Sequence, residues 1–329
     1  MKYNNYQGVL QHPVGSGFNA TSTASDTIKG IDLTGKIAVV TGGNTGIGHE
    51  TTKSLAAAGA TVIVPARDIE KARKNLQGIA GVEVEPMDLM APLSIDNFAN
   101  KFLVAGRPLH LLVNNAGIMW VPLRRDTRGI ESQLATNYLA PFQLTARLWP
   151  ALQQAGGARV VNVSSQGHHF APFHFEDPNF LYGEYETLQG YGQSKTAINL
   201  FSMELDNRAK SSGVRVFAVH PGSIRGTELG REAPLELFQK MGFCDAAGQL
   251  LPEVAASLKS IAQGAATTVW CATSPLLNYI GGVYCEDGEV AQLVDTAGSE
   301  GVQLYSLDAT SAKKLWVLSE EMTGIRFNV

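Results

Sequence analysis

The chain has 329 residues, of which 44% are hydrophobic and 17% are charged, and these proportions suit a globular protein with a large core. Its net charge of −4 and its lack of Lys- and Arg-rich runs argue against a nucleic-acid-binding surface. No apolar stretch has the length of a signal peptide or a membrane span, and the three cysteines have neither disulfide nor metal spacing. We therefore expect a cytoplasmic protein that binds no nucleic acid, spans no membrane and needs no metal.

The composition divides the chain into three expected parts. Residues 1–33 are a polar leader rich in Gly, Ser, Thr and Asn, which is either loosely ordered or lies across its own surface or a partner's. Residues 34–293 carry the strand and helix patterns of one domain, and residues 294–329 form a C-terminal extension with a helical pattern at residues 312–318. No linker rich in Pro or Ser interrupts the domain, so we expect a single folding unit.

The first strand runs directly into a glycine-rich turn. An apolar strand at residues 37–40 precedes the turn at residues 41–48, and a helical pattern follows at residues 49–58. A strand, a glycine turn and a helix in this order predict half of a dinucleotide-binding unit, in which the glycines let the backbone approach a pyrophosphate at a helix N-terminus. The glycines stand at positions 42, 46 and 48, a spacing that differs from the common G-x-G-x-x-G fingerprint.

The second strand, at residues 61–64, is followed by Arg67 and Asp68. An acidic residue at this place usually binds the ribose 2′-hydroxyl of NAD, whereas an arginine suits the 2′-phosphate of NADP. Arg67 therefore favours NADP(H) over NAD(H) as the cofactor. The alternative is a solvated arginine at the start of a helix.

The alternation of strands and helices continues along the chain. Further strands are predicted at residues 82–85, 109–113, 158–163, 214–219 and 282–284. Further helices are predicted at residues 69–77, 94–104, 129–154, 191–210 and 264–274. This alternation predicts an α/β fold with a single Rossmann-type, doubly wound parallel sheet that helices cover on both faces.

The pattern loosens between residues 226 and 263, where short helices and loops rich in apolar residues are expected. This segment follows the sixth strand, and ligands bind beyond the carboxyl ends of the strands in open α/β sheets. It would therefore lie over the ligand as a small helical lid. The alternative is a packed helical hairpin with no substrate role, because apolar residues on short helices usually belong to the core.

Tyr191 and Lys195 stand four residues apart in a predicted helix, and they therefore share a face of it. An unperturbed tyrosine has a pKa of about 10, and a cation held beside it favours the phenolate. We thus expect the pKa of Tyr191 to be lowered toward neutrality, where the phenol would serve as a proton donor and acceptor. The same spacing is also common in plain surface contacts.

Five motifs in sequence resemble the short-chain dehydrogenase/reductase family over about residues 33–290. They are the turn at residues 41–48, Asn-Asn-Ala-Gly at residues 114–117, Ser165, Tyr191-x-x-x-Lys195 and Pro221-Gly222. Within the family the sequence is most similar to the retinol-dehydrogenase-like branch. This similarity lies in the sequence of the glycine turn, in Ala-Arg-Asp after the second strand and in the long insertion at residues 173–190.

The resemblance implies roles for four catalytic residues. Tyr191 would be the general acid in carbonyl reduction and the general base in alcohol oxidation, while Lys195 would bind the nicotinamide ribose and stabilise phenolate. Ser165 would bind the substrate oxygen, and Asn137 would hold a proton-relay water. The implied cofactor-binding residues are Gly42, Asn44, Thr45, Gly46, Ile47, Gly48, Arg67, Asp88, Leu89, Asn115, Ala116, Gly117, Tyr191, Lys195, Pro221, Gly222, Ile224 and Thr227.

Two groups of residues leave choices open. The family expects a threonine five residues after Pro221, but Gly226 stands there, and only a one-residue bulge would bring Thr227 near the pyrophosphate. His49 either touches the 2′-phosphate or is an exposed helix residue. For His168, His169 and His174 we expect a local structural role, because their spacing is not that of a metal site.

The resemblance implies an NADP(H)-dependent oxidoreductase that interconverts a carbonyl and an alcohol. Aromatic residues expected near the mouth of the site suggest a bulky, apolar substrate; they include Trp120, Phe170, Phe173, Phe175, Phe238 and Phe243. The alternatives are a C=C reductase on the same scaffold and a non-catalytic dinucleotide-binding interaction protein. The family's usual homodimers and homotetramers pack through the helices at residues 129–154 and 191–210, so a homo-oligomer is expected.

Overall fold

A computed structural model describes residues 4–296 and 300–329 of the chain. Its centre is an eight-stranded sheet in the order β3-β2-β1-β4-β5-β6-β7-β8. The strands are β1 (Ile37–Val40), β2 (Thr61–Ala66), β3 (Val82–Pro86), β4 (Leu111–Asn114), β5 (Arg159–Val163), β6 (Arg215–Val219), β7 (Val283–Glu286) and β8 (Glu289–Val290). The first seven are parallel and β8 pairs antiparallel with β7. The doubly wound fold is therefore confirmed, with one antiparallel edge strand added.

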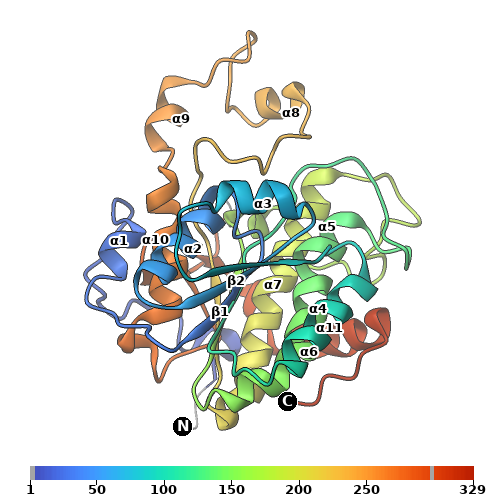
Figure 1. Cartoon of the computed structure of the whole chain (residues 1–329). Coiled ribbons are helices and arrows are strands. Elements are labelled where there is room, and N and C mark those ends of the chain that lie inside the picture. The colour runs from blue at the N-terminus through green and yellow to red at the C-terminus, as the bar shows by residue number, and fades with distance from the viewer. Residues whose placement is uncertain (1–3, 297–299) are drawn as a thin grey trace.

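Helices cover both faces of this sheet (Figure 1). The helices α1 (Ala24–Thr27), α2 (Gly46–Ala57) and α10 (Ile261–Thr273) pack together on one face. On the other face lie α4 (Pro92–Val104), α6 (Ala140–Gln154), α7 (Thr187–Ala209) and α11 (Ala309–Thr323), with a separate buried apolar cluster beneath them. Because both faces are covered, the central strands are mostly apolar, and all five residues of β6 are buried.

The order of the strands determines where a ligand can bind. Sequential strands are added on one side of β1 up to β3, and the chain then crosses back to place β4 on the other side of β1. Such a reversal leaves a crevice at the carboxyl ends of β1 and β4, where open α/β sheets bind their ligands. The glycine turn and the Asn-Asn-Ala-Gly motif follow these two strands. The fold therefore brings together two of the five motifs.

The helix expected at residues 129–154 consists of three segments. Glu131 accepts hydrogen bonds from the amides of Gln133 and Leu134, so α5 (Ser132–Leu134) begins three residues later than expected. A π-helical turn (Ala135–Leu139) separates α5 from α6. Pro141 has no amide hydrogen, so it cannot donate the α-helical bond to the carbonyl of Asn137, and this accounts for the widened turn.

The polar leader lies across its own chain, beside β7. The side-chain amide of Gln11 accepts from the amide of Tyr284 at 3.0 Å and donates to the carbonyls of Tyr284 and Ala291 at 2.6 and 2.7 Å. Asn5 donates to the carbonyl of Gly282 at 2.9 Å. These side chains take the place of the backbone of a neighbouring strand, because they form hydrogen bonds with backbone groups on the outer side of β7.

The C-terminal extension packs over α6 and α7. Trp316 of α11 lies 5.6 Å from the ring of Phe142 and 6.1 Å from the ring of Phe201. In α7, one of the helices through which the family's oligomers usually pack, five apolar residues are buried within this chain: Ala197, Ile198, Phe201, Met203 and Leu205. Their apolar character is thus explained by α11 and the sheet. Among the described ranges, no helix is long and apolar enough to cross a membrane.

Candidate active site

The glycine turn forms a cradle at the N-terminus of α2. Gly42 and Gly46 have φ values of +64° and +54°, which side chains rarely adopt. A Cβ on Gly48 would lie 2.3 Å from the carbonyl oxygen of Gly42, so only glycine fits there. Because α2 begins at Gly46, earlier than expected, the amides of its first turn belong to the motif itself. This backbone can take the pyrophosphate of a dinucleotide, as the N-terminus of a helix favours negative charge.

Thr41 fastens the cradle to the end of β4. Its Oγ1 accepts hydrogen bonds from the amides of Asn115 and Ala116, each at 3.0 Å. Asn115 in return donates through its side chain to the carbonyl of Thr41 at 2.9 Å. Asn115, predicted as a cofactor residue, therefore also shapes the turn. One indication of this role is present in the sequence, because Thr41 is the first residue of the glycine-turn motif.

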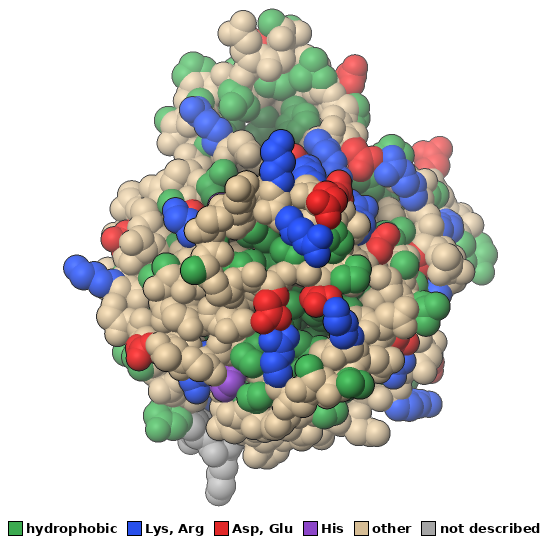
Figure 2. All heavy atoms as spheres, in the orientation of Figure 1, with side chains coloured by type: hydrophobic (Ala, Val, Ile, Leu, Met, Phe, Trp, Pro, Cys, Tyr) green, Lys and Arg blue, Asp and Glu red, His purple; other side chains and the backbone are tan. Residues whose placement is uncertain are grey.

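The end of β2 presents Arg67 to solvent. The neighbouring Asp68 caps α3 (Ile69–Asn75) by accepting from the amide of Lys71 at 2.9 Å. One oxygen of its carboxylate is thus engaged in capping the helix. Figure 2 shows Lys and Arg side chains over α3, below the projecting segment at the top of the molecule, with acidic side chains among them. Lys71 and Arg73 of this helix pair with Glu228 and Glu70.

The surroundings of Arg67 are built from hydrogen-bonded loops. Asn75 donates to the carbonyl of Asn44 in the glycine turn at 3.1 Å, and Nε2 of His49 lies 3.1 Å from the carbonyl of Asn75. After β3, Asp88 accepts from the amide of Met90 at 2.9 Å. The structure thus assigns His49 a contact with α3, and the loop of Asp88 and Leu89 follows the carboxyl end of β3.

Ser165, Tyr191 and Lys195 converge at the end of β5. The Ser165 side chain lies beside the Tyr191 hydroxyl and lowers the pKa of the phenol by its hydrogen-bonding capacity. The Nζ atom of Lys195 donates to the carbonyl of Val163 at 2.9 Å and lies 5.5 Å from the centre of the Tyr191 ring. Tyr191 is 2% exposed and Lys195 is 4% exposed. The pair is therefore a buried cluster rather than a surface contact.

Burial dominates the charges of this cluster. It raises the pKa of Tyr191 to about 12, and the hydrogen bond with Ser165 opposes this shift. It lowers the pKa of Lys195 to about 7. The direction for Tyr191 is opposite to the sequence-based expectation, because desolvation of the phenolate outweighs the attraction of an amine that is itself partly neutral. The protein groups alone therefore keep Tyr191 protonated at neutral pH, as a proton donor.

The lowered pKa of Lys195 has a consequence for stability. The unfolded lysine, whose ordinary pKa is 10.5, binds more protons than the folded one between pH 7 and 10.5, so its contribution to stability rises with pH in this window. We expect the unfolding free energy of the wild type minus that of Lys195→Met to become more positive with rising pH, by at most about 1.4 kcal/mol per unit. Denaturant unfolding at pH 7, 8 and 9 measures it. A signed difference that becomes more negative as the pH rises would contradict the assigned charge state.

Asn137 lies in the π-helical turn, next to Lys195. Its side chain accepts from the amide of Ile118 at 2.9 Å and donates to the carbonyl of Ile118 and the hydroxyl of Ser194, each at 3.0 Å. A Cβ on Gly117 would lie 3.1 Å from Oδ1 of Asn137 and 3.7 Å from Nζ of Lys195. The Asn-Asn-Ala-Gly loop is thus held directly against the lysine.

Two glycines without a predicted role in the site let the cluster close. A Cβ on Gly167 would lie 2.5 Å from the ring of Tyr191, and a Cβ on Gly192 would lie 2.8 Å from the amide nitrogen of Ala171. Gly167 belongs to the 3-10 helix η3 (Gln166–Phe170) that follows Ser165. Only their closeness in space, which the sequence does not give, identifies them.

The segment expected as a lid projects from the carboxyl end of the sheet (Figure 1). Its helices α8 (Leu235–Lys240) and α9 (Pro252–Ser257) contain no buried residue. Trp120, in the loop after β4, lies 5.2 Å from the ring of Phe238 and 6.1 Å from that of Phe243. The segment therefore meets the body through aromatic rings rather than as a packed hairpin.

The base of this segment lies beside the glycine turn. Gly226 has a φ of +78°, and Thr227 follows it. A Cβ on Gly46 would lie 3.8 Å from Cγ2 of Thr227, so the extra residue does bring Thr227 to the turn. Ile224, after Pro221 and Gly222, bridges to Lys259 and packs close to Gly264 of α10.

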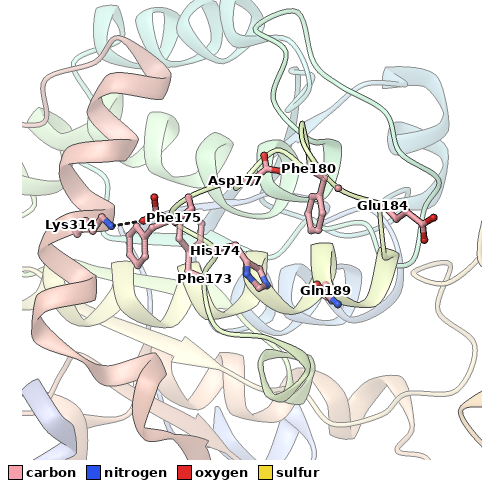
Figure 3. A pocket seen from close by; sticks show the side chains of 10 residues that line it. Phe173, His174, Phe175, Asp177, Phe180, Glu184, Gln189 and Lys314 are labelled. Atoms are coloured by element: carbon pink, nitrogen blue, oxygen red, sulfur yellow. Dashed lines mark hydrogen bonds and ion pairs between the residues drawn. The ribbon is translucent and has the colours of Figure 1, made fainter.

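A separate pocket of about 560 Å³ lies on the insertion that precedes α7 (Figure 3). His174, Phe175 and Phe180 line it together with Lys314 of α11, which pairs with Glu176 at 3.5 Å. None of the predicted catalytic or cofactor residues lines it. The pocket therefore lies apart from the cluster of Ser165, Tyr191 and Lys195.

Comparisons with known proteins agree with this geometry. A family model described as short chain dehydrogenase matches residues 36–236. A protein of Streptomyces lividans described as a probable oxidoreductase is 42% identical over 294 residues, covering 87% of this chain and 97% of its own. Human retinol dehydrogenase 11 is 36% identical over 303 residues, covering 90% of this chain and 88% of its own. The Pseudomonas aeruginosa RhlG/NADP active-site complex has a TM-score of 0.59 at 25% identity, covering 78% and 96%.

The chain belongs to the short-chain dehydrogenase/reductase family, and it is an oxidoreductase of the kind that binds a nicotinamide dinucleotide. Within the family it lies in the retinol-dehydrogenase-like branch, as the similarity to retinol dehydrogenase 11 shows. The family and branch predicted from the five motifs are confirmed.

Proposed function

We propose that the protein is an NADP(H)-dependent oxidoreductase that interconverts a bulky, apolar carbonyl compound and its alcohol. The observation that carries the proposal is the buried cluster in which Ser165 lies beside the phenol of Tyr191 and the Lys195 amine faces its ring at 5.5 Å. A protein that only binds a dinucleotide has no need of a buried phenol, hydroxyl and amine close together. The glycine cradle and the exposed Arg67 fit the pyrophosphate and the 2′-phosphate of the cofactor.

Each residue of the cluster has a distinct task. NADPH, when bound, supplies the hydride for carbonyl reduction. Ser165 holds the carbonyl oxygen at the point where negative charge develops. Tyr191, which burial keeps protonated, delivers its proton to that oxygen. Lys195, whose pKa lies near neutrality, would give its ammonium proton to the phenolate, regain a proton from solvent through the relay water, and bind the ribose. Asn137 fixes the loop beside Lys195 and holds the relay water.

Consumption of NADPH with a panel of carbonyl compounds tests this proposal. We expect turnover of aromatic ketones, long-chain aldehydes, steroids or retinoids, because Trp120, Phe238 and Phe243 form an aromatic wall between the loop after β4 and the projecting segment. The name of the relative retinol dehydrogenase 11 supports an apolar substrate of this kind. A clear preference for sugars would refute the substrate class. Saturation of an enone without reduction of its carbonyl would instead indicate a C=C reductase.

The preference for NADP(H) rests on Arg67. We expect Arg67→Ala to raise the KM for NADPH by roughly 10-fold or more, because it removes a charge-assisted contact with phosphate, and to leave the KM for NADH nearly unchanged. Steady-state kinetics with both cofactors measures the ratio. Arg73→Ala is the matched control, since Arg73 lies on α3 but pairs with Glu70. Equal losses for both cofactors would remove Arg67 from the role.

The division of the chain belongs to the same proposal. Residues 34–293 form the catalytic domain and residues 226–263 its lid, with the leader and the C-terminal extension as additions that pack on it. The absence of buried residues from α8 and α9 supports a lid that can move, and the ion pair between Arg124 and Glu232 supports a closed position against the body.

A further inference from the structure

The C-terminal extension reaches the short helix that follows Ser165. After β9 (Leu293–Val294), the strand β10 (Val302–Gln303) and a short 3-10 helix (Leu304–Leu307) lie against η3, which begins directly after Ser165. The contact joins positions 135 residues apart. The family roles of Ser165, Tyr191 and Lys195 do not account for it.

His168 is the centre of this contact and is fully buried. Its Nε2 accepts a hydrogen bond from the amide of Gln303 at 3.2 Å, and its Nδ1 lies 2.7 Å from the carbonyl of Ser165. An amide can only donate, so Nε2 carries no hydrogen. Nδ1 must then carry it and donate to Ser165. Burial supports this neutral form by lowering the pKa of His168 to about 3.

Further bonds hold η3 in place from the same side. Tyr305 donates its hydroxyl to the carbonyl of His168 at 2.7 Å. Nε2 of His169 lies 3.1 Å from the carbonyl of Gly301, to which it can only donate. The backbone amide of His168 also donates to the carbonyl of Ser165, at 3.2 Å. The imidazole therefore adds a second, shorter bond to an oxygen whose position determines the course of the chain at Ser165.

The position of this backbone determines where the Ser165 hydroxyl lies. Oγ of Ser165 accepts from the amide of Gly167 at 2.9 Å and lies beside the Tyr191 hydroxyl, whose pKa it lowers. The ring of Tyr191 is in turn confined by Gly167. A rotation of the Ser165 peptide would therefore move Oγ away from the phenol.

We propose that His168 is a positioning residue, through which the C-terminal extension holds the backbone of Ser165 so that its hydroxyl faces Tyr191. The proposal rests on the proposed function for its kinetic consequences, but not for its structural ones. It assigns residues 301–305, which no family motif includes, a part in shaping the active site.

A pair of variants separates the two bonds of the imidazole. In His168→Asn the side-chain amide nitrogen takes the place of Nδ1 and can donate to Ser165, but nothing reaches Gln303. In His168→Gln the side-chain oxygen takes the place of Nε2 and can accept from Gln303, but the side chain no longer donates to Ser165, which keeps only the bond from the backbone amide of residue 168. We expect His168→Gln to lose kcat by ~10- to 100-fold, as misplacement of a catalytic group does, and to keep its KM for NADPH. His168→Asn should lose several-fold less.

The pH dependence of alcohol oxidation is a second measurement, and a loss of stability alone would not shift it. The hydrogen bond with Ser165 lowers the pKa of Tyr191, so its loss in His168→Gln should move the pH dependence of alcohol oxidation to higher pH. Tyr138→Phe is the control: it removes a buried hydrogen bond to Ser319 of α11 and leaves the contacts of His168 in place. It should keep both the kcat and the pH profile of the wild type.

Amide exchange of Gly167, followed by NMR, decides the structural part without any substrate. Its amide donates to Oγ of Ser165, so it should exchange faster in His168→Gln than in His168→Asn or the wild type. Equal exchange in all three proteins, or equal losses of kcat in the two variants, would overturn the proposal. If the wild type reduces no carbonyl compound, the proposed function fails, and the exchange rates still decide the role of His168.

Discussion

Tyr191→Phe is expected to lower kcat for carbonyl reduction by roughly 10³-fold or more, with NADPH binding retained. General acid catalysis by a positioned side chain contributes about 10²- to 10⁴-fold, and the hydroxyl of Tyr191 is the group that meets Ser165 in the buried cluster. The ring, which Gly167 confines and which Lys195 faces at 5.5 Å, stays in the variant. Single-turnover reduction of the best substrate, followed by the loss of NADPH absorbance, measures the chemical step.

Tyr138→Phe serves as the matched control for this variant. Tyr138 is also buried, but its hydroxyl bonds to Ser319 of α11, on the face of the sheet that the C-terminal helix covers. It should lose stability and keep kcat, because it removes one buried hydrogen bond outside the site. Near-full activity of Tyr191→Phe in the same assay would refute the role of the phenol.

Gly48→Ala is expected to abolish tight binding of NADPH and to destabilise the fold by about 1–3 kcal/mol. Gly48 lies inside α2, and a Gly-to-Ala substitution in the interior of a helix normally raises the free energy of unfolding by about 1 kcal/mol. Here the new Cβ would lie 2.3 Å from the carbonyl oxygen of Gly42 and 2.4 Å from Nδ2 of Asn115. Neither atom can move away at low cost in free energy, because Nδ2 of Asn115 is hydrogen-bonded to Thr41 and the oxygen of Gly42 belongs to the backbone. The cradle must therefore open.

Thermal unfolding with and without NADPH measures both effects of Gly48→Ala. The wild type should be stabilised by the cofactor, as a ligand that binds only the folded state requires, and the variant should not. Gly183→Ala is the control, since its φ is ordinary and no atom lies within 4 Å of the new Cβ. A Gly48→Ala protein as stable and as cofactor-responsive as the wild type would contradict the close packing of the turn.

The local motifs were readable from the sequence because each depends on a short stretch of chain. The glycines of the turn, the spacing of Tyr191 and Lys195, and the alternation of strands with helices follow from steric and periodic rules. The break at Asn137 was also encoded locally, by Pro141, although a continuous helix was the expectation. Pro141 leaves the carbonyl of Asn137 without its α-helical donor. The pattern of apolar positions does not reveal this loss, which is found only by following the backbone hydrogen bonds residue by residue.

The remaining features depend on contacts between distant parts of the chain. Gln11 replaces a backbone partner of β7, and Gln303 reaches His168, and neither glutamine carries a local signal for this. The charge state of Tyr191 was expected in the wrong direction, because the spacing to Lys195 indicates a nearby amine but not how far both groups are buried. Burial is a property of the whole fold, and here it outweighs the pairwise attraction.

A crystal structure with NADP⁺ and a carbonyl inhibitor tests the central claim most directly. The account predicts a nicotinamide ring beside the Tyr191 hydroxyl, the inhibitor oxygen within hydrogen-bond distance of both Tyr191 and Ser165, and the 2′-phosphate on Arg67. A dinucleotide bound with its nicotinamide away from Tyr191 and Lys195, or an inhibitor oxygen that touches neither hydroxyl, would contradict it.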